Sequence, residues 1–114
     1  YKAIDSNQLK LAMSDNDFVI IDIRNSNEIN KSGIIPGSIS IKAFDEKGNF
    51  LQEFLNKYQE IIQPENKVVF VSQTGVISSI LANGFVEQLD QKNIYHLIGG
   101  INELQKINFD LIKY

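Results

Sequence analysis

The stretch Val68-Val69-Phe70-Val71-Ser72-Gln73-Thr74-Gly75-Val76-Ile77-Ser78 decides the fold of this chain. Its first four residues form a continuous β-branched and aromatic run, which is typical of a strand buried on both faces of a parallel sheet. After Ser78, apolar residues recur at helical spacing, at Leu81, Ala82, Phe85 and Leu89. The stretch therefore predicts a central strand, a tight turn and a helix.

The same alternation of strand and helix continues along the chain. Phe18 to Ile23 predicts a second central strand, and 39–41, 93–98 and Ala3-Ile4 predict further strands, the last at an edge. Helices are expected after Ser6, a suitable N-cap, and over 51–62. Gly84 costs its helix about 1 kcal/mol relative to Ala, which we interpret as a site of close backbone packing. The order of elements predicts an α/β fold with a largely parallel sheet and helices on both faces.

Length and composition limit the kinds of site that this chain can contain. Its 114 residues, 43% of them hydrophobic, predict one domain over residues 1–114. The absence of Cys excludes disulfides, thiolate metal sites and cysteine-based catalysis. There is one His and no cluster of carboxylates, and Asp45 to Asn49 lacks the oxygen spacing of a calcium loop. We therefore expect no metal and no cofactor.

The net charge of −3 does not provide the basic surface that nucleic acids and anionic membranes require. No apolar run approaches the roughly 20 residues of a membrane span, so neither nucleic acid nor membrane is expected as a partner. The oligomeric state is left open.

The chain starts at Tyr1 rather than Met, which indicates trimming or processing of the N-terminus. A removed leader is compatible with this start, and a cytoplasmic location is slightly favoured.

The turn after Val71 is the first place to look for function, because ligands of open α/β sheets bind outside the carboxyl ends of the strands. A strand-to-helix turn presents convergent backbone N–H groups at the positive end of a helix dipole, which suits an anion. Ser72 stands where a nucleophile would stand. The candidate anion-binding loop consists of Gln73, Thr74, Gly75, Val76, Ile77 and Ser78. The alternative is an ordinary connection with a serine cap.

Four segments, in the same order along the chain, resemble the motifs of the rhodanese-like family. Asp22-Ile23-Arg24 with Glu28, followed by Gly33-Ile34-Ile35-Pro36-Gly37-Ser38, resembles its D-x-R-x-x-x-E-[FY]-x-x-G-H-I-P-G-A motif. Ser72 to Ser78 resembles the active-site loop C-x-x-G-x-R-S, and Tyr95 to Ile101 is similar to the L-x-G-G-[IV]-x-x-W motif. The resemblance implies a five-stranded, largely parallel sheet flanked by helices. It also implies transfer of sulfane sulfur from a small anionic donor, thiosulfate or a persulfide, through a Cys persulfide.

The chain departs from the family at the reactive positions. Ser72 stands at the position of the Cys, Ile77 at that of the loop Arg, and Ile34 at that of the motif His. A hydroxyl cannot store sulfur as a persulfide, so the resemblance implies a domain that is inactive as written but keeps an anion-binding loop. The positions that shape the backbone and support the site are retained: Asp22, Arg24, Glu28, Gly33, Pro36, Gly37, Gly75, Ser78, Gly99 and Gly100.

Two histories fit these departures. One is natural loss of catalysis in a module that binds an anion, a peptide or a protein partner. The other is a Cys-to-Ser substitution made in the laboratory in an active thiosulfate sulfurtransferase. Ile77 favours the first, because a substitution aimed at the nucleophile would leave the Arg in place. A partner is then expected near Ile34, Ser72 and Ile77, with an acidic or carboxyl-terminal group entering the loop.

Other readings of the site residues stay open. The phosphatase relatives of this fold are a weaker match, because their longer loop also needs Cys and Arg. A Ser72 hydrolase would need His96, the only imidazole, as its base, and strand alternation is expected to point His96 away from the loop. Arg24, beside Asp22 and Glu28, predicts a structural ion-pair network that joins the second strand to the following helix.

Overall fold

Strand β4 (Lys67–Val71) lies in the middle of a five-stranded sheet, as its continuous apolar run predicts. In the computed structural model, which describes residues 1–114, every strand pair is parallel and the order is β1-β5-β4-β2-β3. The predicted fold class is confirmed. The other strands are β1 (Lys2–Ile4), β2 (Phe18–Asp22), β3 (Ile39–Ser40) and β5 (Ile94–Leu97). The helices are α1 (Ser6–Met13), α2 (Ser26–Ser32), α3 (Gln52–Ile61), α4 (Val76–Glu87) and α5 (Gly100–Lys106).

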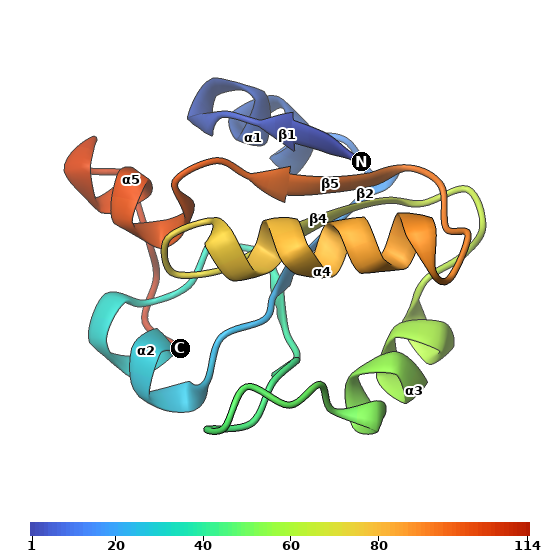
Figure 1. Cartoon of the computed structure of the whole chain (residues 1–114). Coiled ribbons are helices and arrows are strands. Elements are labelled where there is room, and N and C mark those ends of the chain that lie inside the picture. Colours follow the sequence, from blue (N-terminus) through green and yellow to red (C-terminus); the bar gives the residue numbers. More distant parts are fainter.

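Alternate residues of β4 are buried in two separate cores, one on each face of the sheet. Val68 and Phe70 pack with the aromatic side chains of α3 and α4, and Val69 and Val71 pack with apolar side chains of α1 and α5. Figure 1 shows α4 lying across β4 and β5, with α1 at the opposite edge of the picture from α3. Burial on both faces explains why β4 needs no polar residue from Val68 to Val71.

Some helix boundaries differ from the sequence expectations by a few residues. Asp5, not Ser6, is the N-cap of α1, and its carboxylate accepts the Gln8 N–H at 2.9 Å. Helix α4 starts at Val76, which places Ser78 in its first turn as expected, and it ends at Glu87, so Leu89 lies beyond it. Helix α5 follows Gly99 directly. It is only seven residues long, so it is too short to show a periodic apolar pattern in the sequence.

The expectation of close backbone packing at Gly84 is wrong. A Cβ built on Gly84 would meet no atom within 4 Å, and the residue has an ordinary helical backbone. Gly84 therefore lowers the stability of the helix, and no contact inside the domain requires a glycine at this position.

No helix of the structure combines the length and apolar character of a membrane span.

Candidate functional site

Ser72 lies at the carboxyl end of β4 and is 4% exposed. Its Oγ accepts hydrogen bonds from the N–H groups of Gly75 at 3.1 Å and Ser78 at 3.2 Å, and donates one to Ser78 Oγ at 3.0 Å. A serine hydroxyl has one proton and two acceptor lone pairs. All of its hydrogen-bonding capacity is therefore used within the loop.

The remaining N–H groups of the loop have no acceptor inside the protein. These are the N–H groups of Gln73, Thr74, Val76 and Ile77, at and before the first turn of the twelve-residue helix α4. Thr74, Val76 and Ile77 are exposed. The electropositive end of the helix and four free donors at one turn can together accommodate an oxygen acceptor.

Two glycines permit the loop to pack against the start of α5. Gly75 has a φ of +92°, and a Cβ on it would lie 2.9 Å from the Gly99 nitrogen. A Cβ on Gly100 would overlap the Ser72 carbonyl oxygen. That carbonyl instead accepts the N–H of Ile101 at 3.1 Å. The Gly99-Gly100 pair thus serves as the support for the back of the loop.

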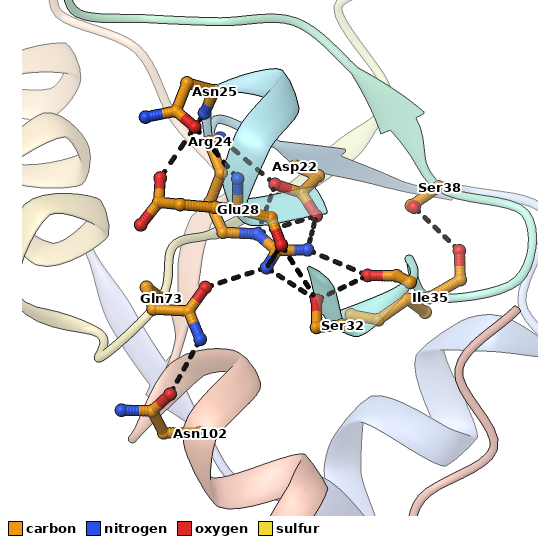
Figure 2. Close-up of polar contacts among 10 residues, drawn as sticks. Asp22, Arg24, Asn25, Glu28, Ser32, Ile35, Ser38, Gln73 and Asn102 are labelled. Atoms are coloured by element: carbon orange, nitrogen blue, oxygen red, sulfur yellow. Dashed lines mark hydrogen bonds and ion pairs between the residues drawn. The ribbon is translucent and has the colours of Figure 1, made fainter. Parts of the chain in front are cut away.

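Arg24 connects the loop to the end of β2, as Figure 2 shows. Its guanidinium makes three hydrogen bonds to the Asp22 carboxylate, from Nε to Oδ1 at 3.0 Å and to Oδ2 at 3.2 Å, and from Nη2 to Oδ2 at 2.8 Å. Nη1 donates to Ser32 Oγ at 2.9 Å and to Gln73 Oε1 at 2.8 Å, and Nη2 donates to the Gly33 carbonyl at 3.0 Å. Arg24 and Asp22 are both buried, so this arginine is held by the protein and is not free to bind a ligand.

The predicted network joining Arg24 to the following helix is present, but the role expected for the Glu28 carboxylate is wrong. Arg24 reaches only the backbone carbonyl of Glu28, at 3.4 Å. The Glu28 side chain instead accepts the Asn25 N–H at 3.4 Å, and Asn25 Oδ1 accepts the Glu28 N–H at 2.9 Å. This reciprocal pair is a capping box, which takes the carboxylate away from the guanidinium.

Gln73 is the loop residue whose contacts the sequence did not predict. Its Oε1 accepts from Arg24, and its Nε2 donates to Asn102 Oδ1 of α5 at 2.7 Å (Figure 2). The loop is therefore held between the β2 end and α5. No local signal in the sequence distinguishes Gln73, because Ser72 and Thr74 on either side of it are also polar.

The expected orientation of His96 is also wrong. His96 is paired in register with Phe70, which faces α4, and its side chain points to the same face. Its Nδ1 lies 3.3 Å from Ser78 Oγ, which also donates to the Gly75 carbonyl at 3.2 Å. Burial lowers the pKa of His96 below its ordinary value, so the imidazole is neutral at pH 7.

A small cavity of about 130 Å³ opens beside the loop. Ile34, which was expected at this mouth, does not line it: Ile34 is buried and exchanges two backbone hydrogen bonds with Ile112. No group of three or more His, Asp or Glu side chains is arranged to hold a metal ion. The cavity is lined by Ile23, Arg24, Asn25, Glu28, Phe44, Asp45, Ser72, Gln73, Thr74 and Ile77.

The lining of this cavity contains two carboxylates and no unpaired cation. Glu28 and Asp45 contribute the carboxylates, while the charge of Arg24 is balanced by Asp22. A backbone hydrogen bond from Asn49 lowers the pKa of Asp45, which is therefore ionised at neutral pH. The free N–H groups favour an oxygen acceptor, whereas the carboxylates oppose a bare multivalent anion.

Comparison with known proteins agrees with this arrangement. Residues 5–107 match the model of the rhodanese-like domain. The chain is 33% identical over 107 residues to the mouse thiosulfate sulfurtransferase/rhodanese-like domain-containing protein 3, a match that covers 90% of this chain and 67% of that protein.

Solved structures show the same fold at lower sequence identity. A rhodanese-related protein from Thermoplasma volcanium superimposes with a TM-score of 0.76 over 100% of both chains, at 21% identity. A protein of unknown function from Rhodopseudomonas palustris, described as a possible tyrosine phosphatase, gives a TM-score of 0.71 at 23% identity, covering 97% of this chain and 84% of that one. With the strand order, the loop and the supporting glycines all in place, the match over residues 5–107 shows that the chain belongs to the rhodanese-like domain family.

Proposed function

We propose that this rhodanese-like domain does not transfer sulfur but binds an oxygen acceptor of a peptide partner, a carboxylate or a backbone carbonyl, at the loop from Gln73 to Ser78. The observation that carries the proposal is the state of Ser72. Its hydroxyl occupies the end of β4, where a sulfur carrier would need a thiol, and its proton and both lone pairs are used by Gly75 and Ser78.

The chemistry of sulfur transfer supports the first half of the proposal. A thiolate attacks the outer sulfur of a donor and keeps it as a persulfide, which depends on a stable S–S bond. Ser72 offers only oxygen, and the chain contains no Cys that could replace it. Ile77, 49% exposed, presents an apolar side chain where a cation would be needed to hold a small anionic donor.

A serine hydrolase is the second candidate, because hydrogen bonds connect Ser72 through Ser78 to His96 at 3.0 and 3.3 Å. The geometry favours it less than the binding function. Ser78 stands between the hydroxyl and the imidazole, so His96 does not contact the atom that it would have to deprotonate. Ser72 is also buried. We expect no labelling of Ser72 by a fluorophosphonate; rapid stoichiometric labelling, lost in Ser72→Ala, would establish the hydrolase instead.

The sulfur-transfer half is tested with thiosulfate and cyanide. The native chain is expected to form no thiocyanate above the uncatalysed background. Ser72→Cys is expected to gain a thiol whose pKa, measured by thiolate absorbance, lies below that of a free cysteine, because two N–H donors and the α4 terminus stabilise the thiolate. Its transfer activity should stay weak without an Arg at position 77. High activity of Ser72→Cys would favour the alternative that the chain is an active sulfurtransferase carrying a Cys-to-Ser change, and turnover by the native chain would refute the proposal.

The binding half is tested by NMR titration of the ¹⁵N-labelled domain with acetate and with sulfate at constant ionic strength. The free amides of Gln73, Thr74, Val76 and Ile77 are expected to shift more than the amides of Gly75 and Ser78, which already bond to Ser72. Affinity should be low, because Glu28 and Asp45 line the mouth. Shifts confined to a distant face of the domain would contradict the proposal.

Ile77→Arg provides the matched gain of function. A charge-assisted hydrogen bond contributes about 1.5–3 kcal/mol, so sulfate should bind roughly 10- to 100-fold more tightly. Leu11→Arg is the control, because Leu11 is an exposed aliphatic residue on α1, away from the loop. An equal gain in both variants would show that sulfate responds only to net charge.

A further inference from the structure

Helix α4 exposes an aliphatic face that has no counterpart on the neighbouring helix. Val76, Ile77 and Ile80 are 49% to 61% exposed, and the only charged residue of α4 is Glu87 at its end. Helix α3 instead exposes Glu53, Lys57 and Glu60. An exposed helix face that lacks charge and carries branched aliphatic side chains marks a contact surface.

This face borders a groove of about 260 Å³ between α4 and the turn from Phe44 to Phe50. Gly84 lies in the groove, where a Cβ would meet nothing within 4 Å. Glycine destabilises a helix relative to alanine, and no internal contact of this domain requires it. The space over Gly84 is therefore available to a side chain from outside. The groove is lined on one side by Ile80, Gly84 and Leu89, and on the other by Phe44, Phe50 and Leu55.

The groove continues into the loop mouth. Phe44 lines both the groove and the smaller cavity beside Ser72. Ile77 lines that cavity and Ile80 lines the groove, and residues three apart on a helix are neighbours on its surface. A single extended segment can thus contact the loop and the groove together.

Charge at the mouth indicates which partner fits. Asp45 and Glu28 lie beside Phe44 in the smaller cavity. Arg24 is the one cation among the residues that line this cavity, and it is already paired with Asp22 at 2.8 Å. A partner with a positive charge next to an aliphatic side chain is therefore complementary to both parts of the surface.

We propose that the groove over Gly84 receives an aliphatic side chain of a peptide segment whose neighbouring Lys or Arg pairs with Asp45 and Glu28. The proposal rests on the proposed function in one respect, since an oxygen of the same segment would enter the loop. It goes further by naming the partner as an apolar, basic peptide rather than an acidic one.

A random peptide library displayed on phage tests this partner chemistry. Selected peptides are expected to share an aliphatic residue close to a Lys or Arg, and to shift the amides of Ile80 and Gly84 as well as those of the loop. Ile80→Asp should weaken their binding about tenfold or more, because burying an isoleucine side chain contributes at least that much. Gly84→Gln should also weaken binding about tenfold or more, because its side chain would fill the groove. Asp45→Asn should weaken the binding of peptides that contain Lys or Arg and leave the binding of uncharged peptides unchanged. Leu11→Asp, at an exposed aliphatic residue of α1, is the matched control.

The outcomes separate this inference from the proposed function. Three results would overturn the inference. The selected peptides could be acidic or uncharged, or they could bind Gly84→Gln as tightly as the native chain. Sedimentation could also show a dimer that the Gly84→Gln substitution dissociates, which would mean that a second copy of the chain occupies the groove. In that case acetate could still shift the loop amides, and the proposed function would stand. If peptides shift the amide signals of Ile80 and Gly84 but not those of Gln73 to Ile77, the groove is a binding site and the proposed binding function of the loop is contradicted.

Discussion

At the scale of single residues, Arg24 is expected to contribute strongly to stability. It is buried against Asp22, and its removal would leave that carboxylate buried without a cation, with only the backbone N–H of residue 24 as a donor at 3.0 Å. Breaking a buried ion pair by removing one side costs about 3–5 kcal/mol. We expect Arg24→Ala to lower the free energy of unfolding by this amount, as measured by urea denaturation.

Lys42→Ala is the matched control for Arg24→Ala. Lys42 also pairs with a carboxylate, that of Glu46, but both side chains of this pair are exposed. Exposed ion pairs contribute about 0–1 kcal/mol, so this variant should unfold nearly as the native chain does. Similar losses in the two variants would show that burial is not what makes the Arg24 pair important.

His96 gives the chain a predictable pH dependence. Burial lowers its folded-state pKa below the ordinary value of 6.5. As the pH falls from 6.5 to the folded pKa, the unfolded chain therefore binds a proton that the folded chain does not, and the free energy of unfolding decreases. His96→Gln should reduce this decrease, measured by urea denaturation between about pH 7.5 and about pH 5.5. An unchanged pH profile would show that His96 is not responsible.

At the scale of elements, the two glycines that flank and occupy α4 should respond in opposite directions to alanine. Gly75→Ala places a side chain at a φ of +92° and against the Gly99 nitrogen, and should cost more than about 1–2 kcal/mol. Gly84→Ala meets open space in a regular helix and should stabilise the domain by about 0.5–1 kcal/mol. Thermal unfolding of the two variants checks both signs; stabilisation by Gly75→Ala would refute the account of the loop.

The sequence alone was sufficient to predict those helices and strands whose own residues carry a clear apolar pattern. The run from Val68 to Val71 is apolar at every position because both faces are buried, so β4 could be recognised directly. Helix α3 shows its apolar face at Phe54 and Tyr58 in the same way. Helix α5 could not be recognised, because it is short and is positioned by Gly99-Gly100 and the loop rather than by its own pattern.

Contacts between elements that are distant in sequence were harder to predict. The position of Ser72 at the carboxyl end of β4 follows from the strand pattern, but the contact of Ser78 with His96 depends on the register between β4 and β5. The hydrogen bond from Arg24 to Gln73 likewise joins segments that only the sheet order brings together. Neither register nor strand order can be read from local periodicity.

At the scale of the whole molecule, β5 is the strand on which the sheet depends. It lies between β1 and β4 and pairs with both. A chain truncated after Asp90 would lack β5 and α5 and leave β1 without a partner. We expect such a fragment to show no cooperative unfolding transition by circular dichroism, whereas removal of only Lys113 and Tyr114, which are exposed, should leave the transition unchanged. A cooperative transition in the fragment would contradict this dependence.

The pairing of β1 with β5 has a consequence for how the chain folds during its synthesis. Within this domain Lys2 to Ile4 is synthesised before the other strands, yet its partners, Tyr95 to Leu97, form the last strand. Loop closure over such a distance in sequence is slow compared with the pairing of adjacent segments. Until β5 is synthesised, β1 has no strand to pair with, although α1 can already pack against β2, so β1 is the strand that stays accessible to chaperones, proteases and aggregation for longest. Of the five strands of this domain, the first to be synthesised is therefore the one whose pairing waits for the last.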